Sequence, residues 1–181
     1  TRSLCDWSSD VCSSDLSWTF VIEALMIAKN IAPWINRKFA FEDWDFYYKN
    51  HIKTQRKNAK TNIFEKKYNI IASDINPEMI EMAKENAKNA WVLGDIKFEI
   101  KDFKEYKKQE LSWILISNPP YWLRLKDDDL KWMYKDLISI FEKNKELKWW
   151  FITSYNDFNY SSFKNRKLYN WNEMCYLYLK K

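Results

Sequence analysis

A short run of residues in the second half of the chain has the chemistry to hold a planar amino group. The run is Ser117-Asn118-Pro119-Pro120-Tyr121, and it directly follows the apolar stretch Ile114-Leu115-Ile116. The side-chain oxygen of Asn118 and a backbone carbonyl beside Pro119 can accept the two N–H bonds of an exocyclic amine. The prolines fix the backbone and remove competing donors, and Tyr121 offers a face on which an extruded base can stack. The bland interpretation of the same residues is a Pro-Pro turn after a buried strand.

Acidic side chains follow two other apolar stretches. Asp74 comes after residues 70–72, and Asp102 comes after residues 96–100. Ligands of open α/β sheets bind at the carboxyl ends of the strands, so Asp74, Asp102 and Asn118 are expected on one rim. There Asp74 can accept from ribose hydroxyls, and Asp102 from an adenine amino group. Taken singly, each acid is more typical of a helix cap or a surface charge; together, at the ends of separate strands, they favour a ligand site.

The elements that must position these residues alternate between strands and helices. Apolar strands are predicted at residues 68–72, 96–100, 113–117, 149–154 and 174–179. Helical spacing predicts helices at residues 19–30, 42–59, 77–87 and 130–144, and the buried face of the second is expected to carry Trp44, Phe46, Tyr47 and Ile52. This alternation predicts one α/β domain built on a doubly wound, mostly parallel sheet.

The overall composition is compatible with a nucleic-acid partner without demanding one. The chain has 181 residues, is 46% hydrophobic and carries a formal net charge of +5. A basic chain suits RNA or DNA, although lysine-rich surfaces are often merely solvated. Three cysteines and one histidine form no ligand cluster, so no metal is expected. No apolar run approaches the roughly 18 residues of a membrane span, and we expect a reduced, cytoplasmic protein.

The glycine and tryptophan counts are abnormal. The chain has 1 Gly and 11 Trp, whereas a typical protein contains about 7% glycine. Many of the tryptophans stand where a turn or helix end would favour glycine. We hypothesise that the gene decodes UGA as glycine and was translated with a table that reads UGA as tryptophan. The candidate positions are Trp18, Trp34, Trp91, Trp113, Trp122, Trp132, Trp149 and Trp171.

The sequence of the first 16 residues does not look native to the protein. Residues 6–16 read as the translation of a widely used sequencing adapter, so residues 1–16 are interpreted as an artefact of library preparation rather than native sequence. The alternative is a Ser/Asp-rich disordered tail. On the first interpretation, residues 17–181 are a partial domain that begins at Ser17.

With glycine restored at the suspect positions, four segments resemble one family. They are residues 17–44, residues 74–87, the Asn118-Pro119-Pro120-Tyr121 run with the next residue, and residues 166–171. Together they are similar to bacterial RNA methylases of the THUMP-associated type, which include large-subunit rRNA guanine-N2 methyltransferases. The chain departs from the family by lacking its first strand, with its Asp-Pro-Phe-Cys-Gly pattern, and the upstream THUMP domain.

The resemblance implies a Rossmann-like class I methyltransferase with its first strand missing and with S-adenosyl-L-methionine as cofactor. It implies RNA as the partner, most specifically large-subunit rRNA, with guanine N2 as the methylated amine. The implied catalytic residues are Asn118, Pro119, Pro120 and Tyr121. The implied cofactor-binding residues are Ser17, Trp18, Thr19, Asp74, Ile75, Asp102 and Asn118. Candidate contacts to RNA phosphates are Arg37, Lys38, Arg124, Arg166 and Lys167.

Two other functions stay open on the sequence. One is an adenine-N6 methyltransferase acting on DNA or RNA, because Asn-Pro-Pro-Tyr serves both amines. The other is a non-catalytic, RNA-binding pseudo-methylase. The printed polypeptide itself is expected to be poorly folded and inactive, because without a first strand the strands near Ile71 and Leu115 would lose their shared partner and leave backbone groups unpaired.

Overall fold

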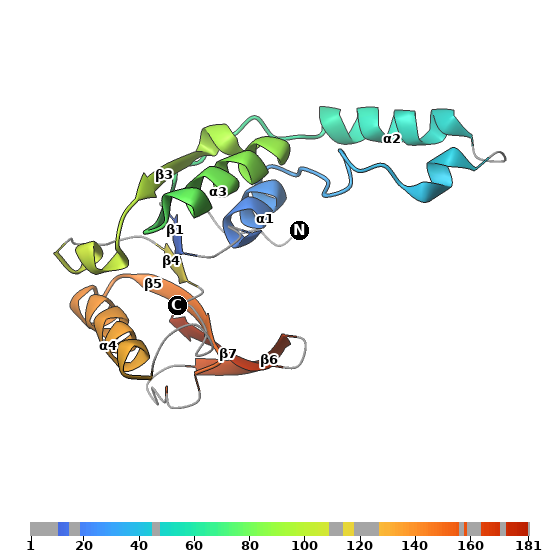
Figure 1. The fold of residues 1–181 in the computed structure, drawn as a ribbon. Helices are drawn as coiled ribbons and strands as arrows, with labels where there is room; N and C mark the ends of the chain where they lie inside the picture. The colour runs from blue at the N-terminus through green and yellow to red at the C-terminus, as the bar shows by residue number, and fades with distance from the viewer. Residues whose placement is uncertain are drawn as a thin grey trace.

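A single mixed sheet organises the described part of the chain. The computed structural model describes residues 11–14, 19–44, 48–108, 114–117, 127–155, 158, 164–170 and 173–180. Within them the strand order is β3-β2-β1-β4-β5-β7-β6 (Figure 1). The strands are β1 Val11–Ser14, β2 Ile70–Asp74, β3 Ile96–Ile100, β4 Ile114–Ser117, β5 Lys148–Thr153, β6 Lys164–Asn170 and β7 Glu173–Lys180. The helices are α1 Thr19–Ala28, α2 Lys49–Thr61, α3 Pro77–Asn89 and α4 Asp127–Lys143, with short 3₁₀ turns η1 Ala40–Asp43, η2 Leu93–Asp95 and η3 Phe103–Lys108.

The sheet is parallel from β3 to β5 and antiparallel at its other end. Each pair from β3 through β2, β1, β4 and β5 is parallel, whereas β7 pairs antiparallel with both β5 and β6. The predicted doubly wound α/β fold is therefore confirmed. The α/β crossovers carry the parallel strands, and a hairpin supplies the outer edge.

The expectation of a missing first strand is wrong. Val11–Ser14 lies between β2 and β4, where Cys12 pairs with Ile71 on one side and with Leu115 on the other. The strands near Ile71 and Leu115 thus share a partner after all. The physical reason is that a sheet ladder is made by backbone N–H and C=O groups, so a short extended segment can occupy the position without carrying the family's sequence pattern.

Helices cover both faces of the sheet, and β4 separates two hydrophobic cores. One core is formed by α1, α3, β2 and the start of β3, and Ile114 and Ile116 of β4 pack against it. The other is formed by η3, α4, β5 and β7, and Leu115 packs against it. Because successive strand residues point to opposite faces, β4 contributes to both cores.

Helix α3 shows how local sequence sets an element's ends. Asn76 is the N-cap, and its side chain accepts from the Glu78 N–H at 2.9 Å, followed by Pro77 at the first helical position. At the other end Trp91 has a φ of 63°, and the Val92 N–H donates to the Ala87 carbonyl at 2.9 Å. This is the Schellman arrangement, in which the left-handed position is usually glycine.

Elements η1 and α2 form an arm that projects away from the sheet (Figure 1). We define the arm as residues 37–44 and 48–62. The predicted continuous helix over residues 42–59 is wrong at its start, because the backbone is extended at Trp44 (ψ 138°) and at Tyr48 (ψ 93°) and the helix begins at Lys49. Trp44, expected to be buried, is 53% exposed, because the arm stands off the core; Phe46 and Tyr47 lie outside the described residues.

The described residues contain neither a membrane-spanning helix nor a metal-binding cluster. None of the helices there has the length and apolar character needed to cross a membrane. In the same residues, no group of three or more His, Cys, Asp or Glu side chains is arranged to hold a metal ion.

Candidate active site

The register of the sheet brings the carboxyl ends of β2, β3 and β4 to one edge of the sheet, which we call the rim. Asp74, the last residue of β2, pairs with Ile100, the last of β3, and the Lys101 N–H donates to the Asp74 carbonyl at 2.9 Å. Because these strands are parallel, Asp102 follows two residues beyond Ile100 at the same edge.

The end of β4 lies at the same level through β1. Ser13 pairs with both Ala72 and Ile116, and Ser14 pairs with Ser117. Counted along this register, β4 ends with Ser117 at the level of Ser73, one residue before Asp74. Asn118 itself lies outside the described residues, but the strand that leads to it ends at the rim.

Asp74 is held by the loop that begins α3. Its Oδ1 accepts from the Asn76 N–H at 2.8 Å, which is an Asx turn. Within the described residues, Oδ2 makes no hydrogen bond, so one carboxylate oxygen remains available to a ligand. The next side chain, Ile75, is 67% exposed. An acceptor beside an exposed apolar side chain fits the ribose and the aromatic base of a nucleoside.

Asp102 combines a capping role with a similar opening. Its Oδ1 accepts from the Lys104 N–H at 2.9 Å, and the Asp102 N–H donates to Glu105 Oε1 at 3.3 Å. Asp102 is thus the N-cap of η3, and Glu105 at the third helical position accepts from its N–H as in a capping box. Elsewhere in the described residues Oδ2 of Asp102 has no hydrogen-bond partner, so the cap leaves an acceptor for a ligand amine.

A buried tyrosine braces this rim from below, and sequence reasoning missed it. The Tyr106 hydroxyl donates to Ser73 Oγ at 3.2 Å, and both residues are buried. The Lys101 ammonium lies 4.1 Å from the centre of the Tyr106 ring, a cation–π contact. Tyr106 therefore ties η3 to β2 beside both acids. Its signal in the sequence was weak, because a single tyrosine in a lysine-rich turn resembles a surface residue.

A second cluster of hydrogen bonds and stacked rings lies at the carboxyl end of β5. The hydroxyls of Tyr134 and Thr153 are hydrogen-bonded to each other, and Thr153 Oγ1 accepts from the Tyr155 N–H at 3.0 Å. The Tyr134 and Tyr155 rings stack, with centroids 5.2 Å apart. This cluster fixes the chain where it leaves β5, two residues beyond the level of Ser117.

Thr19 begins α1, the helix that follows β1 along the chain. The other predicted site residues that the structure describes lie apart from the rim: Arg37 and Lys38 are in the arm beyond α1, and Arg166 and Lys167 are on β6 at the far edge of the sheet. The predicted phosphate contacts therefore belong to separate surfaces. The predicted site residues outside the described part of the chain are Ser17, Trp18, Asn118, Pro119, Pro120, Tyr121 and Arg124.

Comparison with known proteins assigns the family. The sequence-family model described as the RMKL-like methyltransferase domain matches residues 17–174. The chain belongs to this family. It is 34% identical over 161 residues to YpsC of Bacillus subtilis (strain 168), named as a candidate RNA methyltransferase. The resemblance seen in the sequence is thereby confirmed at the level of the family.

Two further relatives define what this methyltransferase domain is similar to. The ribosomal RNA large subunit methyltransferase K/L of Buchnera aphidicola is 38% identical over 127 residues, which is 62% of the chain. The crystal structure of SMU.472, a candidate methyltransferase complexed with SAH, is 29% identical and matches 99% of the chain with a TM-score of 0.83.

These proteins are longer than the chain. The matched part covers 42% of YpsC, 17% of the Buchnera protein and 49% of SMU.472. The chain thus spans about half or less of each relative's length.

Proposed function

We propose that this methyltransferase domain transfers a methyl group from S-adenosyl-L-methionine to an exocyclic base amine in RNA, with guanine N2 of large-subunit rRNA as the target. The observation that carries the proposal is the rim. The carboxyl ends of β2, β3 and β4 lie at one level, with β1 between β2 and β4. Asp74 ends β2, and along the sequence Asp102 follows β3 and the Asn-Pro-Pro-Tyr motif follows β4. The choice of large-subunit rRNA as the substrate is supported by relatives that are named ribosomal RNA large subunit methyltransferase K/L.

The residues of the rim fit the cofactor's nucleoside. When bound, S-adenosyl-L-methionine supplies a methyl group already activated on a sulfonium. Asp74 would accept from the ribose hydroxyls through Oδ2 while Oδ1 keeps its bond to the Asn76 N–H. Ile75 would cover the adenine, and Asp102 would accept from the adenine amine. The complex of SMU.472 with SAH supports this class of ligand.

The Asn-Pro-Pro-Tyr motif would orient and activate the target amine. Hydrogen bonds from the amine N–H groups to Asn118 and to the backbone beside Pro119 draw the lone pair out of the ring and onto nitrogen. Each oriented bond supplies on the order of 1–3 kcal/mol. Tyr121 would stack on the extruded base, and exclusion of water from the site completes the positioning.

The decisive experiment follows labelled methyl groups. The chain with Trp18→Gly and Trp122→Gly is incubated with tritiated S-adenosyl-L-methionine and either rRNA or DNA, and the product is digested and separated into nucleosides. We expect label in N2-methylguanosine from rRNA. Label in N6-methyladenine, from either nucleic acid, would assign the adenine-N6 activity instead.

The experiment needs two forms of the protein. The printed chain carries Trp18 and Trp122 at motif positions where the family resemblance expects glycine, and we expect this form to be inactive. The form with Trp18→Gly and Trp122→Gly is the one expected to methylate. Asn118→Ala in that background should lower the rate by about 100-fold or more, as loss of an oriented polar contact in an active site does.

Binding of the cofactor distinguishes the proposed methyltransferase from a non-catalytic, RNA-binding pseudo-methylase. Equilibrium dialysis with labelled S-adenosyl-L-methionine should show saturable binding by the glycine-restored form. Binding of RNA without binding of the cofactor would support a pseudo-methylase and would overturn the proposal.

A further inference from the structure

The arm carries a helix whose charges all have one sign. Helix α2 contains Lys49, Lys53, Arg56, Lys57 and Lys60 and no acidic residue. Helix α3 has the same length of 13 residues, but it mixes Glu78, Glu81 and Glu85 with Lys84 and Lys88. The contrast marks α2 as a distinct surface rather than an average solvated face.

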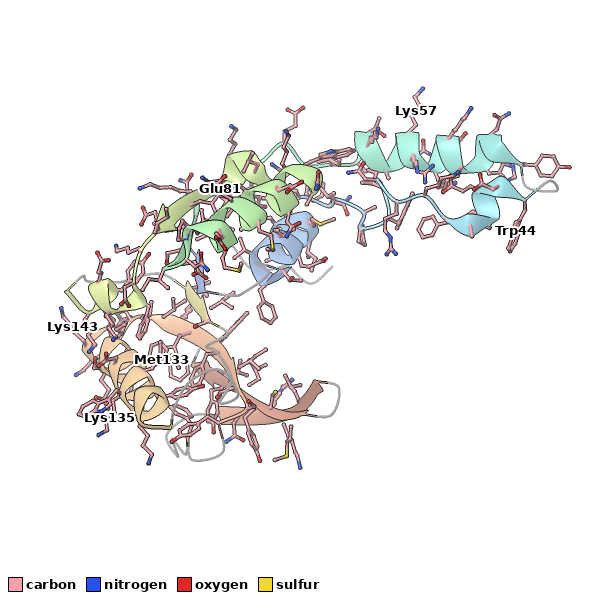
Figure 2. The ribbon with its side chains drawn as sticks, viewed as in Figure 1. Trp44, Lys57, Glu81, Met133, Lys135 and Lys143 are labelled. Atoms are coloured by element: carbon pink, nitrogen blue, oxygen red, sulfur yellow. The ribbon has the colours of Figure 1, made fainter. Side chains whose placement is uncertain are left out.

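The lysines of α2 form one stripe. Lys53, Lys57 and Lys60 are spaced i, i+4 and i+7, which places them on one face of the helix, and Lys49 precedes them by one turn. All three are exposed, and Lys57 extends away from the rest of the molecule (Figure 2). We call Lys53, Lys57 and Lys60 the lysine stripe.

The arm's own acids do not neutralise the lysine stripe. Arg56 binds both carboxylate oxygens of Glu42, at 2.9 and 2.7 Å, and Lys38 lies 2.9 Å from Asp43. Among the described residues, Lys53, Lys57 and Lys60 have no ion pair; Lys60 instead lies over the Trp91 ring at 5.3 Å. Like charges at i and i+4 destabilise a helix, so the stripe costs stability that a polyanion would restore.

Exposed aromatic rings lie at the outer end of the same arm. Tyr48, the residue before α2, is 75% exposed. Trp44 is 53% exposed and lies at the outer end of the arm, where it points away from α2 (Figure 2). Aromatic rings beside a row of cations are the combination by which proteins hold single-stranded nucleic acid, because the cations contact phosphates and the bases stack on the rings.

We infer that the arm is an RNA-binding surface that holds an unpaired strand, with the lysine stripe on its phosphates and Tyr48 under a base. The inference rests on the proposed function, because it takes RNA as the substrate, and it adds a surface distinct from the rim. A protein partner is disfavoured, because the stripe presents one charge and the exposed rings stand at the arm's tip rather than in an apolar patch.

Salt dependence tests the charge component. Binding of fluorescein-labelled oligouridylate is measured by anisotropy over a range of salt concentrations. Replacing Lys53, Lys57 and Lys60 with Gln should weaken binding at least tenfold at low salt and reduce the log–log salt slope by about 2, since each phosphate contact on a single strand contributes about 0.7. The control replaces Lys88, Lys131 and Lys135 with Gln, which removes the same net charge from α3 and α4 and should leave the slope nearly unchanged. Equal effects of the two triple variants would overturn the inference.

Tyr48 tests the stacking component. Tyr48→Ala should weaken oligouridylate binding about tenfold without changing the salt slope, and Tyr48→Phe should bind as the parent does, because the ring face is kept. Loss of binding in both variants, or in neither, would contradict stacking.

The two proposals fail in different ways. If the glycine-restored chain methylates rRNA but the lysine-stripe triple variant binds like its control, only the arm assignment is wrong. If the stripe governs oligouridylate binding but no cofactor binds, the methyltransferase proposal is wrong and the arm stands.

Discussion

The Val92 N–H donates to the carbonyl of Ala87 at 2.9 Å across Trp91, whose φ of 63° places it in the left-handed region. The same geometry closes α1, where the Ile31 N–H donates to Met26 at 2.7 Å across Asn30, with a φ of 56°. Asparagine tolerates that conformation, whereas a bulky side chain is strained in it. Of the two helix ends, only the one at Trp91 calls for glycine.

Trp91→Gly should therefore stabilise the protein by about 1 kcal/mol, because glycine removes the left-handed strain. Urea denaturation measures the change. Trp91→Ala is the control, since it also removes the ring and its contact with Lys60 but keeps the strain. A gain with alanine as large as with glycine would show that the ring, rather than the backbone, is responsible.

Breaking the ion pair between Lys29 and Asp95 should lower the free energy of unfolding substantially. The two groups lie 2.6 Å apart with side-chain exposures of 13% and 4%, and the Tyr68 N–H also donates to Asp95 at 3.0 Å. Lys29→Met leaves a buried carboxylate unpaired and should cost about 3 kcal/mol in the free energy of unfolding.

The exposed pair Lys84–Glu81, also 2.6 Å apart, is the matched comparison for Lys29. Lys84→Met should cost less than about 1 kcal/mol, because solvent screens an exposed pair. Similar losses at the two sites would mean that burial does not set the strength of the Lys29 pair.

Asp74→Asn should weaken cofactor binding while the fold is retained. Asparagine keeps an acceptor for the Asn76 N–H but removes the charge that strengthens bonds from ribose hydroxyls, so we expect about a tenfold or larger rise in Kd. Dialysis with labelled S-adenosyl-L-methionine gives the Kd. Glu146→Gln, in the exposed turn before β5, should leave it unchanged, and an unchanged Kd for Asp74→Asn would remove Asp74 from the site.

The arm should loosen in acid. Hydrogen bonds from Arg56 and from the Phe39 N–H hold the pKa of Glu42 below its ordinary value of 4.5. A lowered folded-state pKa means that the pair's contribution is complete above pH 4.5 and is lost as the pH falls through the folded-state pKa. Glu42→Gln should make the melting temperature less sensitive to acid in this range, whereas Glu85→Gln, on the exposed part of α3, should follow the parent curve.

Much of the sheet was predictable, because most of its strands are apolar or alternate between apolar and polar residues in the sequence. Residues 96–100 alternate and form β3 with those bounds, and the apolar run before Asn118 forms β4. The rim followed from these strands, since parallel strand ends must meet. Tertiary contacts decided the rest. The Lys164–Asn170 segment is too polar to signal a strand, yet it pairs along its whole length with β7, and the helix expected at residue 42 starts only at Lys49 because the arm has no core to cover its first turn.

The tryptophan hypothesis is supported unevenly by the backbone. Trp91 occupies a glycine conformation. The register pairs Asn170 with Glu173, which leaves two residues, Trp171 first, to connect the strands, and such connections favour glycine. In contrast, Trp132 lies inside α4, where glycine would cost about 1 kcal/mol relative to alanine. The codons at these positions decide each case.

Strand β4 is only four residues long, yet Ile114 and Ile116 anchor it in one core and Leu115 in the other. The position of Ser117, at the end of β4, therefore depends on the packing of both helical layers at once. If the motif that follows it orients an amine as proposed, loosening either layer, even far from the rim, would misplace that amine, so the proposed chemistry depends on packing throughout the sheet and both of its helical layers.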